Sequence, residues 1–499
     1  MKLAGRAVAI FLCSLVITAL VGAQVTLPSL LADHMVIQRG EPVHAWGMAS
    51  PKESVSVTFR GETKSTSADE LGRWSIFLSP GEAGGPFTMV VKGANTIELH
   101  DVLVGDVWVA SGQSNMEFPM TELNNAEAEI AAARNPKIRF FLVKHRPSDY
   151  PRSDVEAKTW ALCTPESAAE SSAVAYYFAR DLQQRLNVPI GLLESFWGGT
   201  PAESWTSLHT LSSDASLMPV FASRSKTVDA EETVGLRLEQ AERDYQKAVE
   251  QTKADGKPEA GRPWHPDFNA WAPSALFNGM IAPLTNFPIR GVIWYQGEAN
   301  SGERAPLYAH LFQSMITDWR RAWNEGDFPF LFVQIANWTT EPDGRWPEVR
   351  DAQRRALALR NTGMAVTIDI GDAVDIHPKN KLDVGLRLAR AARAISFGEK
   401  VEWSGPLYRA LTREDHALRV WFDHAAGLTA RGGPLVGFEV AGADGKYVTA
   451  DAKIDGATVI VSSTSVPEPV SVRYAWAANP ACNLDNKEGL PASPFRAPE

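Results

Sequence analysis

Hydrophobic and polar residues alternate along the chain in three different patterns. Between residues 24 and 104, short apolar runs are separated by turn residues, a spacing that predicts an N-terminal β-sandwich. From residue 105 to about residue 400, strand-like apolar runs alternate with amphipathic helical segments. Residues 401–499 return to short β-like runs, which predict a C-terminal β-rich domain or, as the alternative, strands that complete the N-terminal sandwich.

The middle pattern predicts an α/β catalytic region with a mainly parallel sheet covered by helices on both faces. The strands are expected at residues 107–109, 138–143, 188–196, 290–297, 328–335 and 363–370. The helices are expected at residues 122–133, 168–186, 307–323, 349–360 and 381–395. Residues 211–262 break this alternation and are strongly charged over 231–257, which predicts a helical insertion on the surface.

The first 23 residues have the pattern of an export signal. Lys2 and Arg6 precede an apolar run over residues 7–20, and the small residues 21–23 suit a cleavage site. We therefore expect a mature chain that begins at Gln24 and is exported to the periplasm or the extracellular space. The apolar run is short for a membrane span, so an uncleaved anchor is the weaker alternative.

Charge and cysteine content narrow the function classes. Removal of the predicted signal takes the net charge from −10 to −12, because two basic residues leave with it. An acidic protein is poorly suited to bind nucleic acid or an anionic membrane, and we expect neither partner. Cys163 and Cys482 remain after signal cleavage, and either a disulfide or two free thiols is compatible with export.

The stretch V-W-V-A-S-G-Q-S-N-M at residues 107–116 reads as a strand, a glycine turn and the start of a helix. It places Ser114 just past the carboxyl end of a sheet strand, where open α/β sheets bind their ligands. A serine there has backbone N–H donors nearby, which an acyl-transfer nucleophile needs. An ordinary turn serine fits the same stretch, so the assignment depends on partners elsewhere in the chain.

His377 is the best candidate for the base that such a serine requires. It follows the last predicted strand of the α/β region, and Asp372 and Asp375 lie just before it. A serine nucleophile needs a base to accept its proton and an acid to orient that base. Asp372, Asp375 and His377 as metal ligands are the alternative, but no further His or Cys stands at ligand spacing.

Two further strand ends carry residues suited to a site. Trp197-Gly198-Gly199 follows the strand at 188–196, and its bare backbone offers N–H donors for an oxyanion. The strand at 290–297 ends in a polar cluster that contains Gln296, Glu298 and Asn300. Residues 263–272, which include Trp264, His265 and Trp271, are expected to form a loop that borders the site.

Four blocks, in this order, resemble the sialate O-acetylesterase family, which belongs to the wider SGNH (GDSL-like) hydrolases. They are G-Q-S-N-M at 112–116, F-W-G-G-T-P-A-E-S-W at 196–205, G-V-I-W-Y-Q-G-E-A-N at 291–300 and D-I-H-P-K-N-K at 375–381. The stretches L-L-A-D-H-M-V-I-Q-R at 30–39 and E-G-L-P-A-S-P-F-R at 488–496 are also similar to that family. The resemblance implies a flavodoxin-like three-layer catalytic domain, flanking β domains, and neither a metal nor another cofactor.

Carried over by position, the resemblance also implies roles for individual residues. Ser114 is expected to be the nucleophile and His377 the general base, with Asp375 orienting the histidine and Asp372 as the fallback. The wider superfamily commonly has D-x-x-H where this chain has D-x-H, so a Ser–His dyad stays open. The oxyanion hole is expected to combine the Ser114 N–H, an N–H of Gly198 or Gly199, and the Gln296 side chain, which stands where many relatives have Asn. Glu298 and Asn300 are expected to shape the substrate pocket.

The expected activity is removal of O-acetyl groups from a carbohydrate through an acetyl-serine intermediate. Sialic acid is the expected sugar, and its carboxylate calls for a cation such as Arg304, Arg345, Arg350 or Arg387. An acetylated hemicellulose, xylan or xyloglucan, is the alternative within the esterase class. From other classes, a glycoside hydrolase with Glu203 and Glu298 as paired carboxylates, or a non-catalytic carbohydrate-binding protein, stays open.

Overall fold

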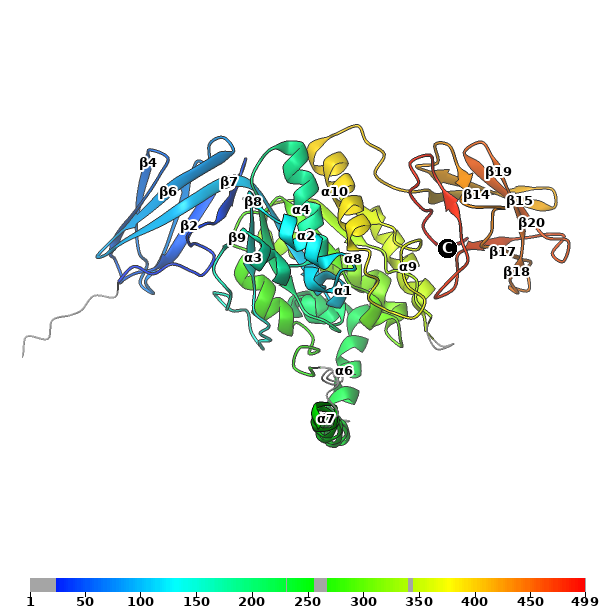
Figure 1. Cartoon of the computed structure of the whole chain (residues 1–499), viewed down its shortest axis with the longest axis horizontal. Coiled ribbons are helices and arrows are strands. Elements are labelled where there is room, and N and C mark those ends of the chain that lie inside the picture. Colours follow the sequence, from blue (N-terminus) through cyan, green and yellow to red (C-terminus); the bar gives the residue numbers. More distant parts are fainter. Residues whose placement is uncertain (1–23, 230, 255–266, 340–343, 499) are drawn as a thin grey trace, which may run out of the picture.

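The computed structural model describes residues 24–229, 231–254, 267–339 and 344–498. The predicted signal at residues 1–23 lies outside the described residues, as do Trp264 and His265. The protein is a mixed α/β fold with one large central sheet and smaller sheets at both ends of an elongated molecule (Figure 1). Within the described residues, no helix combines the length and apolar character needed to cross a bilayer.

Six strands of the central sheet run parallel to their neighbours, in the order β13-β12-β11-β7-β10-β8. Their bounds are β7 (Thr96–Gly112), β8 (Asn135–Leu142), β10 (Ile190–Phe196), β11 (Gly291–Tyr295), β12 (Phe330–Val333) and β13 (Thr362–Ala365). The short strand β9 (Ala161–Cys163) is antiparallel to β8. Every residue of β10, β11, β12 and β13 is buried, as expected for strands covered on both faces.

Helices on the two faces of this sheet belong to two different hydrophobic cores. On one face, α4 (Ala173–Leu186) packs against α10 (Lys381–Phe397), and their apolar residues join Ala110, Ile293 and Leu331 from the sheet. On the other face, α8 (Ala305–Trp323) and α9 (Trp346–Arg355) join Val292 and Phe332. The alternation of strands and helices in the sequence therefore predicts both the parallel pairing and the double-sided cover.

Strand β7 is shared between the central sheet and the N-terminal strands. Its first half pairs antiparallel with β6 (Gly84–Lys92), and its second half pairs parallel with β10 and β11. The predicted boundary at residue 104 therefore falls inside one continuous strand. The remaining N-terminal strands are β1 (Val36–Gln38), β2 (Val43–Met48), β3 (Ser54–Phe59), β4 (Glu62–Ser67) and β5 (Arg73–Leu78).

The C-terminal strands form their own hydrophobic core at the opposite end of the molecule from the N-terminal strands (Figure 1). They therefore do not complete the N-terminal sandwich, and that alternative is wrong. One sheet contains β14 (Leu407–Glu414), β15 (Ala417–Asp423), β19 (Asp451–Asp455) and β20 (Thr458–Ser462). A second contains β17 (Phe438–Ala441), β18 (Val448–Thr449), β21 (Ser471–Tyr474) and β23 (Phe495–Ala497), and a third pairs β16 (Thr429–Ala430) with β22 (Leu484–Asp485).

Buried polar contacts join the C-terminal strands to the central part. The guanidinium of Arg350, in α9, donates to the carbonyl oxygens of Ala477 and Ala478. Gln334, which follows β12, donates to Ser493 Oγ at 2.8 Å.

The two cysteines are free and lie in different parts of the molecule, Cys163 in β9 and Cys482 before β22, and burial raises the pKa of each thiol to about 11.

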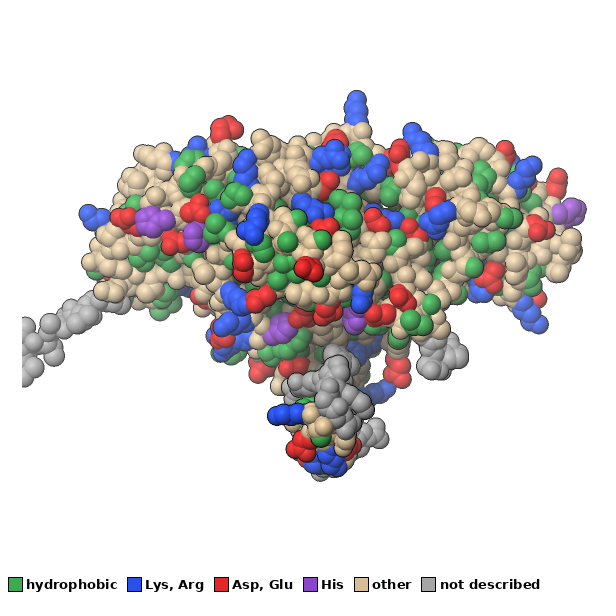
Figure 2. Space-filling model, in the orientation of Figure 1, with side chains coloured by type: hydrophobic (Ala, Val, Ile, Leu, Met, Phe, Trp, Pro, Cys, Tyr) green, Lys and Arg blue, Asp and Glu red, His purple; other side chains and the backbone are tan. Residues whose placement is uncertain are grey.

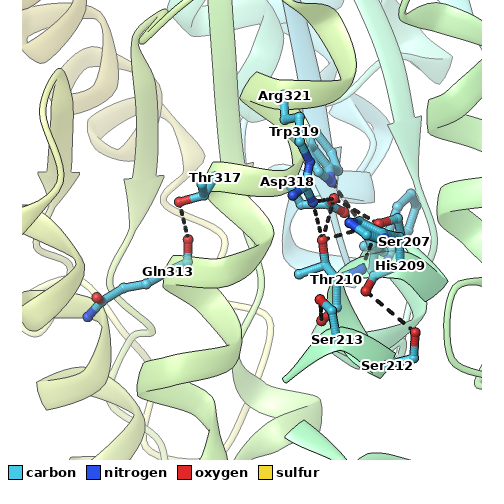
Figure 3. Close-up of polar contacts among 11 residues, drawn as sticks. Ser207, His209, Thr210, Ser212, Ser213, Gln313, Thr317, Asp318, Trp319 and Arg321 are labelled. Atoms are coloured by element: carbon cyan, nitrogen blue, oxygen red, sulfur yellow. Dashed lines mark hydrogen bonds and ion pairs between the residues drawn. The ribbon is translucent and has the colours of Figure 1, made fainter. Parts of the chain in front are cut away.

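The charged insertion is helical, with α5 (Leu208–Ser213), α6 (Pro219–Asp229) and α7 (Glu231–Ala254). The buried carboxylate of Asp318, in α8, anchors the start of α5, because it accepts hydrogen bonds from Ser207 and Thr210 (Figure 3). Asp318 also forms an ion pair with Arg321. Beyond this anchor, α6 and α7 project from the body of the molecule (Figures 1 and 2). Acidic and basic side chains are interspersed over the face that Figure 2 shows.

Two predicted helices are broken in the structure. The segment 168–186 becomes α3 (Pro165–Glu170) and α4, because Ser171 and Ser172 end one helix and the Ser172 side chain caps the next. The segment 122–133 contains a short 3₁₀ turn, η1 (Met120–Glu122), and α2 (Ala126–Ala132). Before them, a single helical turn, α1 (Ser114–Glu117), begins directly at Ser114.

Candidate active site

Neighbouring parallel strands bring three sequence motifs to one edge of the sheet. Gly112, at the end of β7, lies beside Phe196 of β10 and Tyr295 of β11. The residues that follow these strands, among them Ser114, Gly198 and Glu298, therefore emerge next to one another, as the strand order requires. A fourth motif, on the loop between β13 and α10, reaches the same edge with His377.

Ser114 and His377 are in hydrogen-bond contact although 263 residues separate them in the sequence. The distance from Ser114 Oγ to His377 Nε2 is 2.8 Å. A neutral imidazole with its proton on Nδ1 accepts the serine hydroxyl at this distance. Burial, and then the charge of Lys381, lower the pKa of His377 from its usual value near 6.5, so the neutral form that can act as a base prevails at neutral pH.

The two candidate orienting acids lie in the loop before His377 but are turned to its backbone. Asp375 Oδ1 accepts the backbone N–H of His377 at 2.8 Å and lies 3.8 Å from His377 Nδ1, longer than a hydrogen bond. Asp372 Oδ1 accepts the backbone N–H groups of Val374 and Asp375. Of the two, Asp375 is therefore the carboxylate placed near the histidine ring, and its side chain is 46% exposed.

Gly198, which follows β10, lies against Ser114. A Cβ atom added to Gly198 would lie 3.3 Å from Ser114 Cβ and 3.2 Å from Glu117 Oε2, so a larger residue would crowd Ser114. Gly199 has φ of +74°, a conformation that favours glycine. The N–H of Gly198 donates to Glu117 Oε2 at 2.6 Å. This hydrogen bond leaves the N–H of Gly199 as the less committed donor of the pair.

Gln296 and Asn300 lie beneath the site in a buried network instead of facing its cavities. The Gln296 amide donates to Thr200 O and to Asn300 Oδ1, while its own oxygen accepts the Tyr308 hydroxyl. Asn300 in turn donates to Glu203 Oε2 at 2.9 Å. Both side chains are fully buried, and neither lines a cavity that Ser114 borders.

Glu298 is the member of the β11 cluster that borders the cavity. Its Oε1 accepts a hydrogen bond from Asn115 Nδ2 at 2.8 Å, whereas its buried Oε2 has no partner among the described residues. Burial raises the pKa of this carboxyl. Glu203, the second carboxylate of the glycosidase alternative, is buried away from the cavity and pairs with Arg304 at 2.9 Å, an arrangement that does not suit a pair of catalytic carboxylates.

Two cavities open on either side of Ser114 and His377, and both include these two residues in their walls. We call the larger one, of about 680 Å³, the tryptophan lobe, because Trp197, Trp271, Trp338 and Trp346 line it. Trp271 belongs to the segment that was expected to border the site. The other, of about 610 Å³, is the mixed lobe, lined by apolar residues together with Lys144, Lys158, Glu122 and Glu170.

None of the arginines considered for a substrate carboxylate lines either lobe in the part of the chain that the structure describes. Arg304 pairs with Glu203, and Arg387 pairs with Asp369 at 2.7 Å. Arg350 is fully buried and donates to backbone carbonyls. Arg345 lines a different cavity and, among the described residues, pairs with Glu348 at 3.7 Å.

Sequence reasoning missed four residues close to Ser114 or to its neighbours in the site. Glu117 contacts Gly198 and also pairs with His145 at 3.2 Å, and the His145 ring stacks on Trp197 with 4.3 Å between ring centroids. Asn115, which directly follows Ser114, accepts a buried hydrogen bond from Lys381. Asn115 and Lys381 stand inside the recognised motifs, so their positions were a signal, whereas nothing in the sequence singles out His145.

The described residues contain no group of three or more His, Cys, Asp or Glu side chains that could hold a metal ion. The alternative site formed by Asp372, Asp375 and His377 is therefore not assembled, because Asp372 and Asp375 turn to backbone N–H groups.

Comparisons with known proteins agree with the motifs. A family model described as carbohydrate esterase, sialic acid-specific acetylesterase matches residues 264–394. The chain is 31% identical to the sialate O-acetylesterase of Mus musculus in an alignment 527 positions long, gaps included, which covers 94% of this chain and 93% of the relative. It is 32% identical to that of Homo sapiens over 421 residues, 76% of this chain and 72% of the relative.

A solved structure is similar over almost the whole chain. The crystal structure of a carbohydrate acetylesterase from Xanthomonas citri superposes with a TM-score of 0.82 at 37% identity, covering 95% of this chain and 99% of that one. Both curated relatives are more than 30% identical and are matched over more than two thirds of each chain, so the family expected from the four motifs is confirmed. The chain belongs to the sialate O-acetylesterase family of carboxylic ester hydrolases.

Proposed function

We propose that this protein is an exported serine esterase that removes O-acetyl groups from carbohydrates through an acetyl-serine intermediate. The observation that carries the proposal is the 2.8 Å contact between Ser114 Oγ and His377 Nε2 at the junction of two cavities. Family membership supports the ester chemistry. The apolar segment at residues 7–20, with Lys2 and Arg6 before it, supports export.

The reaction has two steps. In the first, His377 accepts the hydroxyl proton of Ser114 while Oγ attacks the acetyl carbonyl, and the imidazolium then gives this proton to the departing sugar oxygen. In the second, His377 takes a proton from water, the resulting hydroxide attacks the acetyl-serine carbonyl, and the proton returns to Ser114 Oγ as acetate leaves. Both steps need the neutral histidine that the lowered pKa favours.

The oxyanion formed in each step needs N–H donors near Ser114. Among the described residues, the backbone N–H groups of Ser114 and Gly199 donate to no other protein group, so both remain available. We assign the oxyanion hole to these two donors. Both N–H groups of the Gln296 amide already donate to Thr200 and Asn300, so Gln296 is not one of the oxyanion donors. Its role in this proposal is to hold the loops that carry the donors.

Asp375 acts on His377 in two ways in this proposal. Its hydrogen bond to the His377 N–H fixes the loop, and its charge 3.8 Å from Nδ1 favours the imidazolium that forms during the reaction. At this distance the contribution is electrostatic, so the site works closer to a Ser–His dyad with a nearby carboxylate than to a tightly bonded triad.

The architecture that we propose follows the chemistry. Residues 105–400 form the catalytic domain, a flavodoxin-like three-layer SGNH-type fold with the helical insertion at about 211–262. Residues 24–104 form a sandwich-like N-terminal domain, and residues 401–499 form a C-terminal β-rich domain. The parallel order of the central strands and the helices on both faces support the three-layer part of this proposal, and the separate core of the C-terminal strands supports the boundary near residue 400. The N-terminal domain shares strand β7 and a hydrophobic core with the catalytic domain.

Two sugars are candidate substrates, and the lobes favour one of them. Sialic acid carries a carboxylate, but in the described part of both lobes the lysines are Lys144, which is exposed, and Lys158, which pairs with Glu170. The tryptophan lobe instead offers apolar faces of the kind on which neutral sugar rings stack. An acetylated neutral polymer such as xylan or xyloglucan therefore fits these walls better than sialate.

The test is acetate release from O-acetylated sialic acid, acetylated xylan and acetylated xyloglucan, each with the wild type and with Ser114→Ala. We expect release by the wild type alone, with the neutral polymers preferred. Release from sialic acid alone would keep the mechanism and replace the substrate. Equal release by Ser114→Ala would contradict the proposal itself.

A further inference from the structure

Lys381 is a buried cation with one polar side-chain partner, Asn115, which directly follows Ser114 in the sequence. Its side chain is 1% exposed, and Nζ donates to Asn115 Oδ1 at 2.5 Å. The ammonium also lies 4.5 Å from the centroid of the Phe118 ring and 5.5 Å from that of Tyr295. Among the described residues it forms no ion pair. Burying an ammonium without an ion-pair partner costs free energy of folding, so we expect this lysine to serve a function.

Lys381 determines which way the Asn115 amide points. A lysine ammonium has only donors, so the atom of Asn115 that faces it must be the oxygen. The amide nitrogen then faces the other way, where it donates to Glu298 Oε1 at 2.8 Å and to the carbonyl oxygen of Ile376 at 3.1 Å. A rotated amide would lose all three hydrogen bonds and would place two N–H groups against the ammonium.

These hydrogen bonds join the two halves of the reacting pair. Asn115 directly follows Ser114, and Ile376 directly precedes His377. Glu298 belongs to η6 (Glu298–Asn300), after β11, so the one amide connects the ends of β7 and β11 with the loop that carries the base. We call Lys381, Asn115 and Glu298 the buried clamp.

We infer that Lys381 is a positioning residue for the esterase reaction: by fixing the Asn115 amide, it holds the Ser114 turn and the His377 loop at the separation at which the proton can pass. The inference rests on the roles proposed above for Ser114 and His377. It assigns a function to the last residue of D-I-H-P-K-N-K, which the reaction itself does not use.

The charge of Lys381 also acts on the base. The charged groups that face His377 are Lys381 from α10, Asp375 from its own loop, and Glu122 from η1, while Glu117 of α1 and His145 border the same cavities. Lys381 lowers the pKa of His377, and the two carboxylates raise it. Burial brings the pKa of Lys381 itself to about 7, so the ammonium is present over the pH range in which His377 loses its proton.

The test replaces Lys381 with methionine, which keeps the length and the apolar stem of the side chain but has no charge or donor. We expect kcat to fall roughly 10- to 100-fold, as for a small misplacement of reacting groups, while KM changes less than about threefold. We also expect the acid limb of the pH profile of kcat to move to higher pH. Without the positive charge of Lys381, the imidazolium of His377 is less destabilised and the pKa of His377 rises. A purely structural role would not move this limb.

Arg393→Met is the matched control. Arg393 is also a mostly buried cation of α10, but it pairs with Glu399 and lies near Asp181, away from the cavities. Its loss is expected to lower the melting temperature without moving the acid limb.

A second variant, Asn115→Ala, breaks the clamp at its centre and carries the test if Lys381→Met does not fold. When both fold, the double variant should lose little more kcat than the worse single one, because both remove one unit. Wild-type kcat in Asn115→Ala, independent multiplicative losses, or an unmoved acid limb in folded Lys381→Met would overturn the inference. Ser114→Ala assayed in parallel separates this failure from that of the proposed function, which alone predicts its inactivity.

Discussion

The central feature at the residue scale is the hydrogen bond between Ser114 and His377, beside a carboxylate that is too far from the histidine ring to form a hydrogen bond with it. The carboxylate of Asp375 lies 3.8 Å from His377 Nδ1 and is partly exposed to water. Water and salt screen such a contact, so its contribution to the rate should be smaller than that of a buried, hydrogen-bonded acid.

Asp375→Asn tests this placement. The asparagine oxygen can still accept the N–H of His377, so the loop is kept and only the charge is lost. We expect kcat/KM to fall about tenfold or less, against a loss of at least about 10³-fold in His377→Gln, which removes the base. Steady-state kinetics on one acetylated sugar compares the two variants. A loss in Asp375→Asn as large as that in His377→Gln would mean that the site is a tight triad.

The pH dependence of activity should follow His377. The histidine must be neutral to accept the serine proton, and its pKa is lowered from 6.5. The kcat/KM of the wild type is therefore expected to rise with pH along a limb whose midpoint lies below 6.5. Asp375→Asn should move this midpoint further down, because the carboxylate raises the pKa of His377. A midpoint above 7 in the wild type would contradict the assignment of the base.

Sequence reasoning at this scale succeeded where a residue stands at a strand end and failed where a contact closes between distant segments. The positions of Ser114 and His377 after strands were visible in the pattern of apolar runs. The hydrogen bond from the Gln296 amide to Asn300 and the contact between Glu117 and Gly198 depend on how loops pack, which no local pattern encodes. For Lys381, the motif D-I-H-P-K-N-K marks the position, but the sequence does not show that its ammonium contacts Asn115.

At the scale of elements, the arrangement depends on three neighbouring strands that end together. The apolar runs predicted the strands correctly because a parallel strand that is covered on both faces has almost no polar positions. Helix boundaries were less accurate. The serines at 171 and 172 were read as part of one amphipathic helix, although their side chains satisfy helix ends better than helix interiors.

Glu194, in the middle of the site's supporting strand β10, offers an element-scale prediction. Its carboxyl is buried and accepts the N–H of Ser172 at the start of α4, and burial raises its pKa to about 8. A group with a raised pKa in the folded state stabilises the fold in its protonated form, so stability is lost as pH rises from the unfolded value near 4.5 toward 8.

Glu194→Gln removes this dependence because an amide stays neutral. Relative to the wild type, the variant should gain stability between pH 5 and pH 8 by more than about 1.4 kcal/mol, the free energy of one pKa unit. Chemical denaturation at the two pH values measures the difference. The same offset between wild type and variant at both values would show that Glu194 does not titrate in this range.

At the scale of the whole molecule, the N-terminal strands and the central sheet are less separable than the sequence predicted. Strand β7 belongs to both, and one hydrophobic core extends from Val25 to Ile368 across them. The sequence showed where the pattern changes but could not show that the change falls inside a strand. The C-terminal strands, by contrast, have a core of their own, which the change in pattern near residue 400 left open.

This continuity predicts the outcome of a truncation. A chain that begins at residue 105 lacks the first half of β7 and its partner β6, and it exposes apolar residues of the shared core. We expect it to be insoluble, or to melt at a much lower temperature than the chain that begins at residue 24. Soluble expression, thermal melting and acetate release measure this. A truncated chain with the melting temperature and kcat of the longer one would show that the two parts are independent.

The central claim is that Ser114 carries the acetyl group and that His377 activates it. Peptide mass mapping after reaction with a serine-reactive phosphonate tests it most directly, with an acetylated sugar as competitor. We expect one adduct on Ser114 that the sugar suppresses, no adduct in Ser114→Ala, and much slower labelling in His377→Gln. An adduct on another residue that the sugar still suppresses, or unchanged labelling without His377, would contradict it.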